Sequence, residues 1–364
     1  MPTRRDNELS NLLRSYRHHY NPAEIVALFT KVDEARVLNL ASALSSYIAT
    51  NLPKAIERRA GVADYRTNPY VLMTSASVMK LGDPVKFANF LFNNKLYMGL
   101  ETSFGKSIEA AFVSQYPLDS NRVTFWQDAP EKLAEFGELT GLNREDRARR
   151  RTESIWREID KSCVIGNRRY LTTIKSGPNC INDSQVSAMT RALIDNHKSF
   201  LAQSKATYPD VTEIDVVVGI TYGTDKTTNN KENQILIKLL DHGFEEEDRV
   251  NAPGILIDSA TRSIRVYRRI GKDFWSFIGN PRSPNDADFV FLEVLLALAK
   301  ALSMGMAEAD LETRINVKLQ ALSAALAGIV FSRQSLPNWV REDFSEDQVF
   351  WFATAMTAFF DEGI

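Results

Sequence analysis

Two short β-rich runs on either side of a glycine-asparagine step constrain the fold of this chain more than any other feature. The runs are IDKSCVI and YLTTIKSG, and GNRR at 166–169 separates them. Such runs around a tight turn are typical of a β-hairpin. The second run breaks sharply after Lys175, where Ser-Gly-Pro-Asn follows. The sequence therefore predicts a hairpin with Lys175 near the end of its second strand.

The segments after the hairpin predict alternating helices and strands. A helix capped by Asp183 or Ser184 continues to Pro209, and 213–223 (EIDVVVGITYG) has the apolar run of a buried strand. Two more strands are expected in ILIDS and SIRVYRR. Strands with interposed helices favour an α/β fold, with a central mixed β-sheet flanked by helices.

Both ends of the chain have the spacing of apolar residues that is typical of helices. The pattern is helical to about residue 140, and one expected helix runs from about Ser107 to Tyr116. The expected loops are Thr224–Lys231, Glu245–Pro253 and Asn280–Asn285. We expect three parts, which are a helical N-terminal region at 1–100, a core at 101–285 and a helical C-terminal region at 286–364.

Composition excludes several classes of protein. The chain has 364 residues, and no apolar run is long enough to suggest a membrane span. Two cysteines and four scattered histidines provide neither a disulfide framework nor a zinc site. We expect a cytoplasmic protein. The net charge of −2 disfavours a protein that coats DNA, but it leaves room for local basic patches such as 144–151.

The pair Asp160 and Lys175 carries the first indication of chemistry. The two residues lie 15 positions apart, a spacing that antiparallel strands joined by a tight turn can close. Such a spacing is common by chance, but an ammonium at the end of a buried strand is costly unless it is paired. A carboxylate that holds Mg²⁺ and a lysine near the attacking water suit phosphodiester hydrolysis.

Four segments in order carry a resemblance to a known family. They are SFGKSIEAAF at 103–112, IDKSCVIGNRRYLTTIKSGPNCINDSQ around the hairpin, VVVGITYGTDKTTNNKENQ at 216–234 and GKDFWSFIGNP at 271–281. Together they resemble type II restriction endonucleases of the PD-(D/E)xK nuclease superfamily. The resemblance implies a nuclease-like core and the Mg²⁺-dependent, sequence-specific cleavage of double-stranded DNA.

The same resemblance assigns roles to residues of this chain. Asp160 would bind the metal and Lys175 would be the catalytic lysine, while the Ile174 carbonyl would be a further metal ligand. Thr173 stands in the catalytic motif where the family normally has Asp or Glu. A second carboxylate must then come from elsewhere, and the candidates are Glu109, Glu153 and Glu158. We favour Glu109 as a catalytic and metal-binding residue, because its neighbours Ile108 and Phe112 are expected to face the core.

The resemblance also implies how the protein meets DNA and other partners. Polar residues after the hairpin and in the loop at 224–234 are expected to contact DNA, namely Ser176, Asn179, Asn182, Gln185 and Lys226. Symmetric duplex sites are matched by two-fold protein symmetry, so a homodimer is expected. A cognate DNA methyltransferase is expected as a genetic partner and not as a stable complex.

Two other interpretations remain beside the nuclease. Thr173 permits a non-catalytic DNA-binding protein with a degenerate nuclease core. The segment Gly99-LETSF-Gly105-Lys106-Ser107 is similar to a phosphate-binding P-loop, but it has five residues between its glycines where that loop requires four. The nucleotide-binding interpretation is therefore disfavoured, and Lys106-Ser107 is expected to open the helix that bears Glu109.

Overall fold

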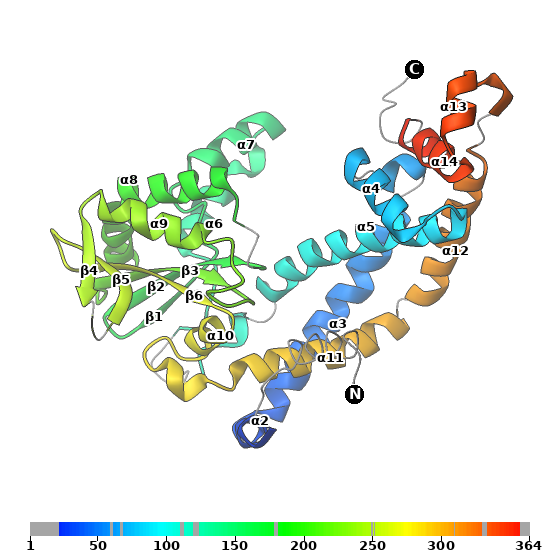
Figure 1. Cartoon of the computed structure of the whole chain (residues 1–364). Coiled ribbons are helices and arrows are strands. Elements are labelled where there is room, and N and C mark those ends of the chain that lie inside the picture. The colour runs from blue at the N-terminus through cyan, green and yellow to red at the C-terminus, as the bar shows by residue number, and fades with distance from the viewer. Residues whose placement is uncertain are drawn as a thin grey trace, which may run out of the picture.

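A mixed six-stranded sheet lies to one side of a body of long helices (Figure 1). The computed structural model describes residues 22–356 except 59–60, 66–67, 110–112, 119–123, 178–180, 249, 251, 309 and 330–332. The strands are β1 Lys161–Ile165, β2 Arg168–Lys175, β3 Glu213–Ile220, β4 Phe244–Asp248, β5 Ala252–Asp258 and β6 Ile264–Ile270. The helices are α2 Pro22–Phe29, α3 Glu34–Glu57, α4 Pro69–Met79, α5 Pro84–Ser107, α6 Pro130–Gly137, α7 Arg144–Glu153, α8 Asp183–Thr207, α9 Lys231–Leu240, α10 Lys272–Gly279, α11 Val290–Glu308, α12 Leu311–Ala327, α13 Asn338–Asp343 and α14 Glu346–Ala355.

The strand order β1-β2-β3-β6-β5-β4 combines parallel and antiparallel pairs. β2, β3 and β6 run parallel to one another, while β1 and β5 are antiparallel to their neighbours. The predicted hairpin is confirmed, with Lys161 opposite Thr172 and Ile165 opposite Arg168. Gly166 takes a positive φ of 60° at its turn, which glycine adopts without steric cost. The predicted α/β fold with a mixed sheet flanked by helices is confirmed.

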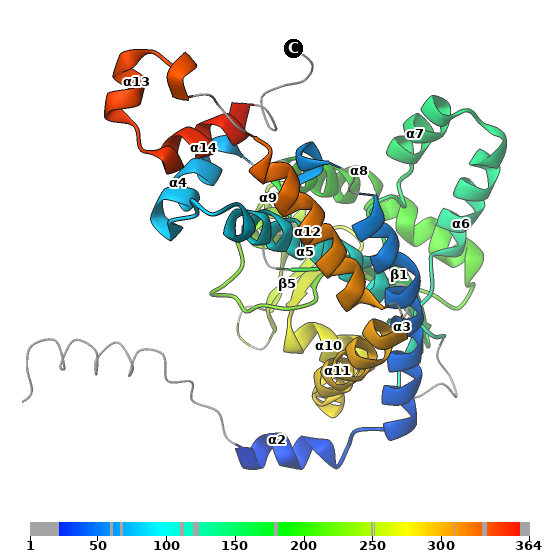
Figure 2. The ribbon, with the colours of Figure 1, turned by 90° about the vertical axis from the view of Figure 1, so that its right-hand side faces the viewer.

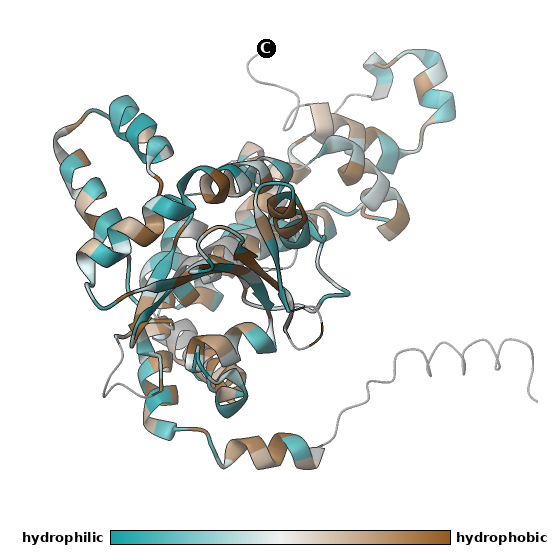
Figure 3. Cartoon of the chain, turned by 90° about the vertical axis from the view of Figure 1, so that its left-hand side faces the viewer, coloured by the Kyte–Doolittle hydropathy of each residue, from teal (hydrophilic) through white to brown (hydrophobic). Residues whose placement is uncertain are grey.

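Each face of the sheet is buried against helices because alternate strand residues point to opposite faces. Leu171 and Val218 pack with Val186 and Leu193 of α8 in one cluster. Tyr170, Val217 and Tyr267 pack on the other face with Phe274 and Phe277 of α10. Figure 3 shows brown in the central strands, between helices that combine brown and teal residues. The parallel strands are therefore covered on both sides, as such strands require.

The helical body joins the early and late parts of the chain. α3 lies along α11, and α5 lies along α12, in both ribbon views (Figures 1 and 2). Buried Glu293 of α11 links these parts, because its carboxylate accepts hydrogen bonds from the Asp33 N–H (2.9 Å), Arg36 (3.0 Å) and the Tyr116 hydroxyl (2.5 Å). The three-part domain division stays a prediction. No helix among the described residues is long and apolar enough to cross a membrane.

The predicted helix from Ser107 to Tyr116 is wrong. Ser107 instead ends α5, Ile108 and Glu109 continue with π-helical geometry, and a 3-10 turn follows at Val113–Gln115. Gly105 lies inside α5, where a Cβ atom would come within 2.7 Å of the Ser176 Cβ. Gly105 thus allows α5 to approach the end of β2 closely. Lys106 and Ser107 end the helix and do not open one.

Three smaller predictions also need correction. The helix after the hairpin is capped by Asn182, and not by Asp183 or Ser184, because Asn182 forms a capping box with Gln185. Glu245–Pro253 is not a loop throughout: it contains most of β4 and the start of β5. The acidic side chains of β4 make its sequence look like a loop. An edge strand tolerates such charged residues. The loop at Asn280–Asn285 ends in a 3-10 turn at Pro284–Ala287.

Arg169 of β2 is fully buried, and it is held between two aromatic rings. Its guanidinium donates two hydrogen bonds to Glu131, at 2.7 and 2.8 Å, and lies over the rings of Trp156 and Tyr208. Burial alone would raise the pKa of Glu131, but the hydrogen bonds from Arg169 and Thr207 lower it overall. This pair joins β2 to α6 and fixes the segment that leads into β1.

Replacing Arg169 is expected to destabilise the protein strongly. Arg169→Ala leaves the Glu131 carboxylate without its partner, and losing one member of a buried pair costs about 3–5 kcal/mol. Urea unfolding followed by circular dichroism measures this loss. The control is Arg149→Ala, since Arg149 is exposed and pairs with exposed Asp146, an arrangement worth at most about 1 kcal/mol. Equal losses in the two variants would contradict the prediction.

Candidate active site

Asp160 and Lys175 meet at one end of the hairpin. Asp160 directly precedes β1 and Lys175 is the last residue of β2. The Asp160 N–H donates to the Thr172 carbonyl at 2.9 Å, and the Ile174 N–H donates to the Asp160 carboxylate at 2.6 Å. The carboxylate is therefore fixed by the backbone of the opposite strand. The positive charge of Lys175 acts on it directly, since it lowers the pKa of Asp160.

Burial dominates the electrostatics of Asp160. It raises the pKa of this carboxyl, and the opposing effects of Lys175, the Ile174 hydrogen bond, Lys132 and Lys161 do not fully cancel it. A carboxylate in such surroundings is stabilised by any further positive charge. This is the environment in which a cation binds favourably.

Glu109 brings a second carboxylate to the same place. It follows the end of α5, and its pKa is raised first by burial and then by the negative charge of Asp160. The charge of Asp160, before β1, therefore acts on Glu109 just after α5, and Asp160 is acted on in turn by Lys175 at the end of β2. Two acids whose charges repel each other in a partly buried site are a common feature of functional centres.

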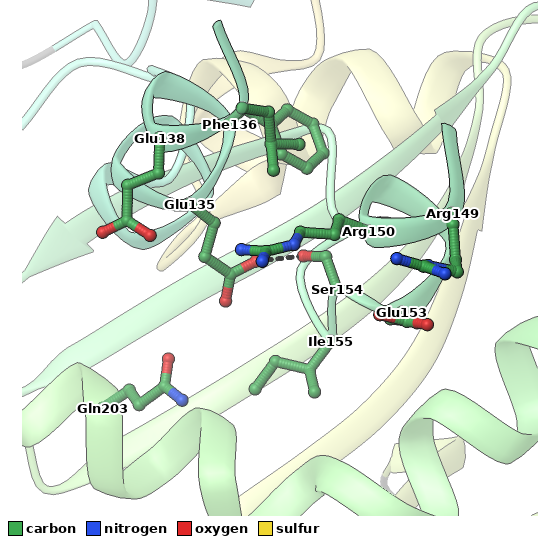
Figure 4. A pocket seen from close by; sticks show the side chains of 10 residues that line it. Glu135, Phe136, Glu138, Arg149, Arg150, Glu153, Ser154, Ile155 and Gln203 are labelled. Carbon is green, nitrogen blue, oxygen red and sulfur yellow. Dashed lines mark hydrogen bonds between the residues drawn. The ribbon is translucent and has the colours of Figure 1, made fainter. Parts of the chain in front are cut away.

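The other two candidate carboxylates have different surroundings. Glu158 pairs with its neighbour Arg157 at 3.4 Å. Glu153 is exposed and lines a hollow of about 660 Å³ between α6, α7 and α8. Figure 4 shows this hollow, where the Glu135 carboxylate hydrogen-bonds to Ser154 and the Arg150 side chain extends toward it.

Thr173 lies two residues before Lys175, so both side chains are on the same face of β2. Its side chain is buried, and its hydroxyl has no hydrogen-bond partner in the part of the chain that the structure describes. An unpaired buried hydroxyl costs about 1–3 kcal/mol. The family that this chain resembles normally has an acid at this position, and here the Thr173 hydroxyl oxygen is buried without a hydrogen bond among the described residues.

These oxygen atoms fit a Mg²⁺ ion. No group of three or more Asp, Glu, His or Cys side chains is placed to hold a metal within the described ranges. Mg²⁺ usually retains several waters and uses one or two carboxylates, which Asp160 and Glu109 can provide. The Ile174 carbonyl points to the same edge of β2 as the Ile174 N–H that contacts Asp160, because both groups of a strand residue point the same way.

Lys132, Lys161 and Asp128 complete the charged surroundings of the site, and the sequence gives no indication of them. Lys132 of α6 donates to the Ile159 carbonyl at 2.6 Å, and Lys161 pairs with Asp128 at 2.9 Å. Both lysines lower the pKa of Asp160 and of Glu109. Gln127 pairs with Ser162 beside β1, which carries this distant segment to the hairpin. Only the folded chain brings these residues together.

The predicted DNA-contacting residues occupy different surroundings. Ser176 adjoins Gly105 at the end of α5, and Lys226 is exposed in the loop after β3. Asn182 and Gln185 form the cap of α8, with reciprocal hydrogen bonds of 2.9 and 3.0 Å. The cap gives both side chains a structural role at the base of the hairpin. Asn179 lies outside the described residues.

Comparison with known proteins finds one family model that matches this chain. The part of the chain that contains the hairpin and most of the sheet resembles type II restriction endonucleases. The particular family whose model matches is described as type II restriction endonuclease EcoO109I, and the match covers residues 145–298. That range includes Asp160, Lys175 and α10, while Glu109 lies before it. No curated protein matches the chain.

The pKa shifts predict a distinctive dependence of stability on pH. Because the pKa values of Asp160 and Glu109 are raised, the folded state binds their protons more tightly than the unfolded state. Stability without metal should then fall as pH rises through these raised values. In Asp160→Asn/Glu109→Gln this part of the fall should disappear, as measured by urea unfolding in EDTA between pH 4 and 8 (about the range where carboxyl groups with raised pKa values titrate). Parallel curves for the two proteins would refute it.

A bound metal ion should offset the loss of stability that the ionised Asp160 and Glu109 cause. Millimolar Mg²⁺ is expected to raise the melting temperature of the native protein, because a ligand that binds only the folded state stabilises it. The double variant should show no such rise. Glu153→Gln, which changes an exposed acid outside the site, is the control and should respond as the native protein does. A Mg²⁺ effect of equal size in the double variant would place the metal elsewhere.

Proposed function

We propose that this protein is a Mg²⁺-dependent type II restriction endonuclease that hydrolyses phosphodiester bonds at specific sites in double-stranded DNA. The observation that carries the proposal is the Asp160 carboxylate held against the end of β2 by the Ile174 N–H, where the charge of Lys175 acts on it and its own charge acts on Glu109. The family match to residues 145–298 supports the same class of enzyme.

Asp160 and Glu109 would hold the metal, together with the Ile174 carbonyl. Mg²⁺ in this position would polarise the scissile phosphate and lower the pKa of a bound water. The Ile174 N–H fixes the Asp160 carboxylate, so the site is organised before DNA arrives. Lys175 would orient the attacking water and stabilise the negative charge that develops on the phosphate. Thr173 would take part only through its buried hydroxyl.

DNA would lie across the end of the sheet that carries Lys175. Ser176, Asn179, Asn182, Gln185 and Lys226 belong to segments that follow β2 and β3 at this end, where they would contact phosphates or base edges. A homodimer would place one site on each strand of a symmetric sequence. A DNA methyltransferase that protects the host sequence would be its genetic partner, and the enzyme would act in the cytoplasm.

Cleavage of DNA tests the proposal directly. The purified protein is incubated with plasmid of mixed sequence in Mg²⁺ or in EDTA, and the products are separated on a gel. We expect discrete fragments in Mg²⁺ only. Binding without cleavage under every condition would favour the alternative, a DNA-binding protein with a degenerate nuclease core, for which Thr173 is the supporting observation. Sequencing the fragment ends would then give the recognition site and the cut.

Substitutions at the site test the residue assignments. Asp160→Ala and Lys175→Ala should each lower the cleavage rate by at least about 100-fold, since each removes a group that acts on the developing charge. Gel shift in EDTA should show DNA binding retained. Cleavage at the native rate in either variant would refute the assignment.

The source of the second carboxylate needs its own comparison. Glu109→Ala should abolish cleavage, whereas Glu153→Ala and Glu158→Ala should not. An acid restored to the hairpin provides a stricter test, because Thr173→Asp in the Glu109→Ala background should recover part of the activity if the two positions serve one metal. Full activity of Glu109→Ala alone would exclude Glu109.

A further inference from the structure

The edge of the sheet that carries Lys175 continues into a second polar hollow. Gly177 follows the β2 end and packs so closely on Tyr222 that a Cβ atom would lie 2.5 Å from the Tyr222 hydroxyl. Gly271 then approaches the Gly223 carbonyl in the same way, and its N–H donates to Ile220 at 2.8 Å. The segment after β2 therefore contacts the segment after β3, which in turn contacts the segment after β6. These contacts connect the candidate active site to Lys272.

This second hollow exists because β5 separates from β6. The two strands pair at Leu256–Val266 and Ile257–Arg265, and the register does not continue toward Ile270. The opening has a volume of about 340 Å³, and its lining includes Thr224, Arg269 and Lys272. The hollow lies at the end of the sheet where β2, β3 and β6 all end, which is also the end that carries Lys175.

The cations of the hollow differ in how they are paired. Arg268 is neutralised by Asp225 at 2.7 Å and by Glu232 at 3.2 Å. Arg269 and Lys272 have no ion-pair partner within the described part of the chain, and the Arg269 Nε is buried without a hydrogen bond. Two acids line the hollow. Asp225 forms an ion pair with Arg268, which leaves Asp273 as the acid of this lining that can offset the charges of Arg269 and Lys272.

Aromatic rings hold both unpaired cations in position. The Arg269 guanidinium lies 5.0 Å from the centre of the Tyr267 ring, and the Lys272 ammonium lies 5.4 Å from that of Phe291. Such stacking orients a cation without neutralising its charge. The hollow thus presents two oriented cationic donors, Arg269 and Lys272, that have no ion-pair partner among the described residues.

We propose that Arg269 and Lys272 bind a backbone phosphate of the DNA a few nucleotides from the cleaved one, and so position the duplex for cutting. This inference rests on the proposed nuclease function. β6 lies two strands from β2, roughly 10 Å at the usual spacing of strands. That span corresponds to about three phosphates along one DNA strand, measured along the helix axis. Phosphate contacts of this kind fix the register of a duplex without reading its sequence.

The salt dependence of DNA binding tests this proposal. Binding of the native protein and of Arg269→Ala/Lys272→Ala to a duplex of randomised sequence is measured by fluorescence anisotropy in EDTA, over a series of salt concentrations. Each lost phosphate contact should reduce the slope of log K against log salt by about 0.9, and weaken binding at about 0.1 M salt by roughly 10-fold. Arg269→Lys/Lys272→Arg keeps both charges and should retain the native slope.

The control removes two charges elsewhere. Lys205→Ala/Arg262→Ala changes exposed residues at the end of α8 and in the turn before β6, and it should keep the native slope. Melting temperatures establish that all variants are folded. If the native protein binds and cuts DNA while Arg269→Ala/Lys272→Ala matches the control, the phosphate site is refuted and the nuclease remains. If the native protein neither binds nor cuts, both proposals fail.

Discussion

The hydrogen bond from the Ile174 N–H to the Asp160 carboxylate is the contact on which the candidate site depends. It joins the residue before β1 to the residue before Lys175, so the acid and the lysine are held by one rigid hairpin. The carboxylate could otherwise turn toward Lys132 or Lys161, which both act on its pKa. Organisation by the backbone leaves the other oxygen atoms of the site available for a metal. Sites on strands are positioned more accurately than sites on loops.

The local parts of this arrangement were predictable from sequence. The hairpin has two short β-rich runs, a positive-φ glycine in its turn and an abrupt stop after Lys175, and each of these is a local property. The parallel strand β3 is buried from Ile214 to Ile220 and carries an apolar run at Val216–Val218, because both of its faces are covered. The edge strand β4 was not predicted because it consists mostly of acidic residues. Two of these acids, Glu245 and Glu247, pair with Arg262 and Arg265.

The contacts between distant segments were not predictable in the same way. The approach of α5 to the hairpin depends on Gly105 meeting Ser176, which no periodicity records. Glu109 was favoured for its apolar neighbours, yet the helix expected there begins and ends at other residues. Lys132 and Asp128 join the site only because their segments pack beside β1. The pKa of Asp160 is thus shifted by residues from α6, β1 and the end of β2.

The buried carboxylate of Glu293 has a consequence for how the protein is made. It ties α11 to Asp33 and Arg36 at the start of α3, although more than half of the chain separates them. During synthesis the early helices therefore emerge long before their packing partners, and their apolar faces must wait in contact with solvent or chaperones. α5, which leads to Glu109, packs on the late helix α12 in the same body. A growing chain would complete this support for α5 and the candidate site only after α12 has been synthesised.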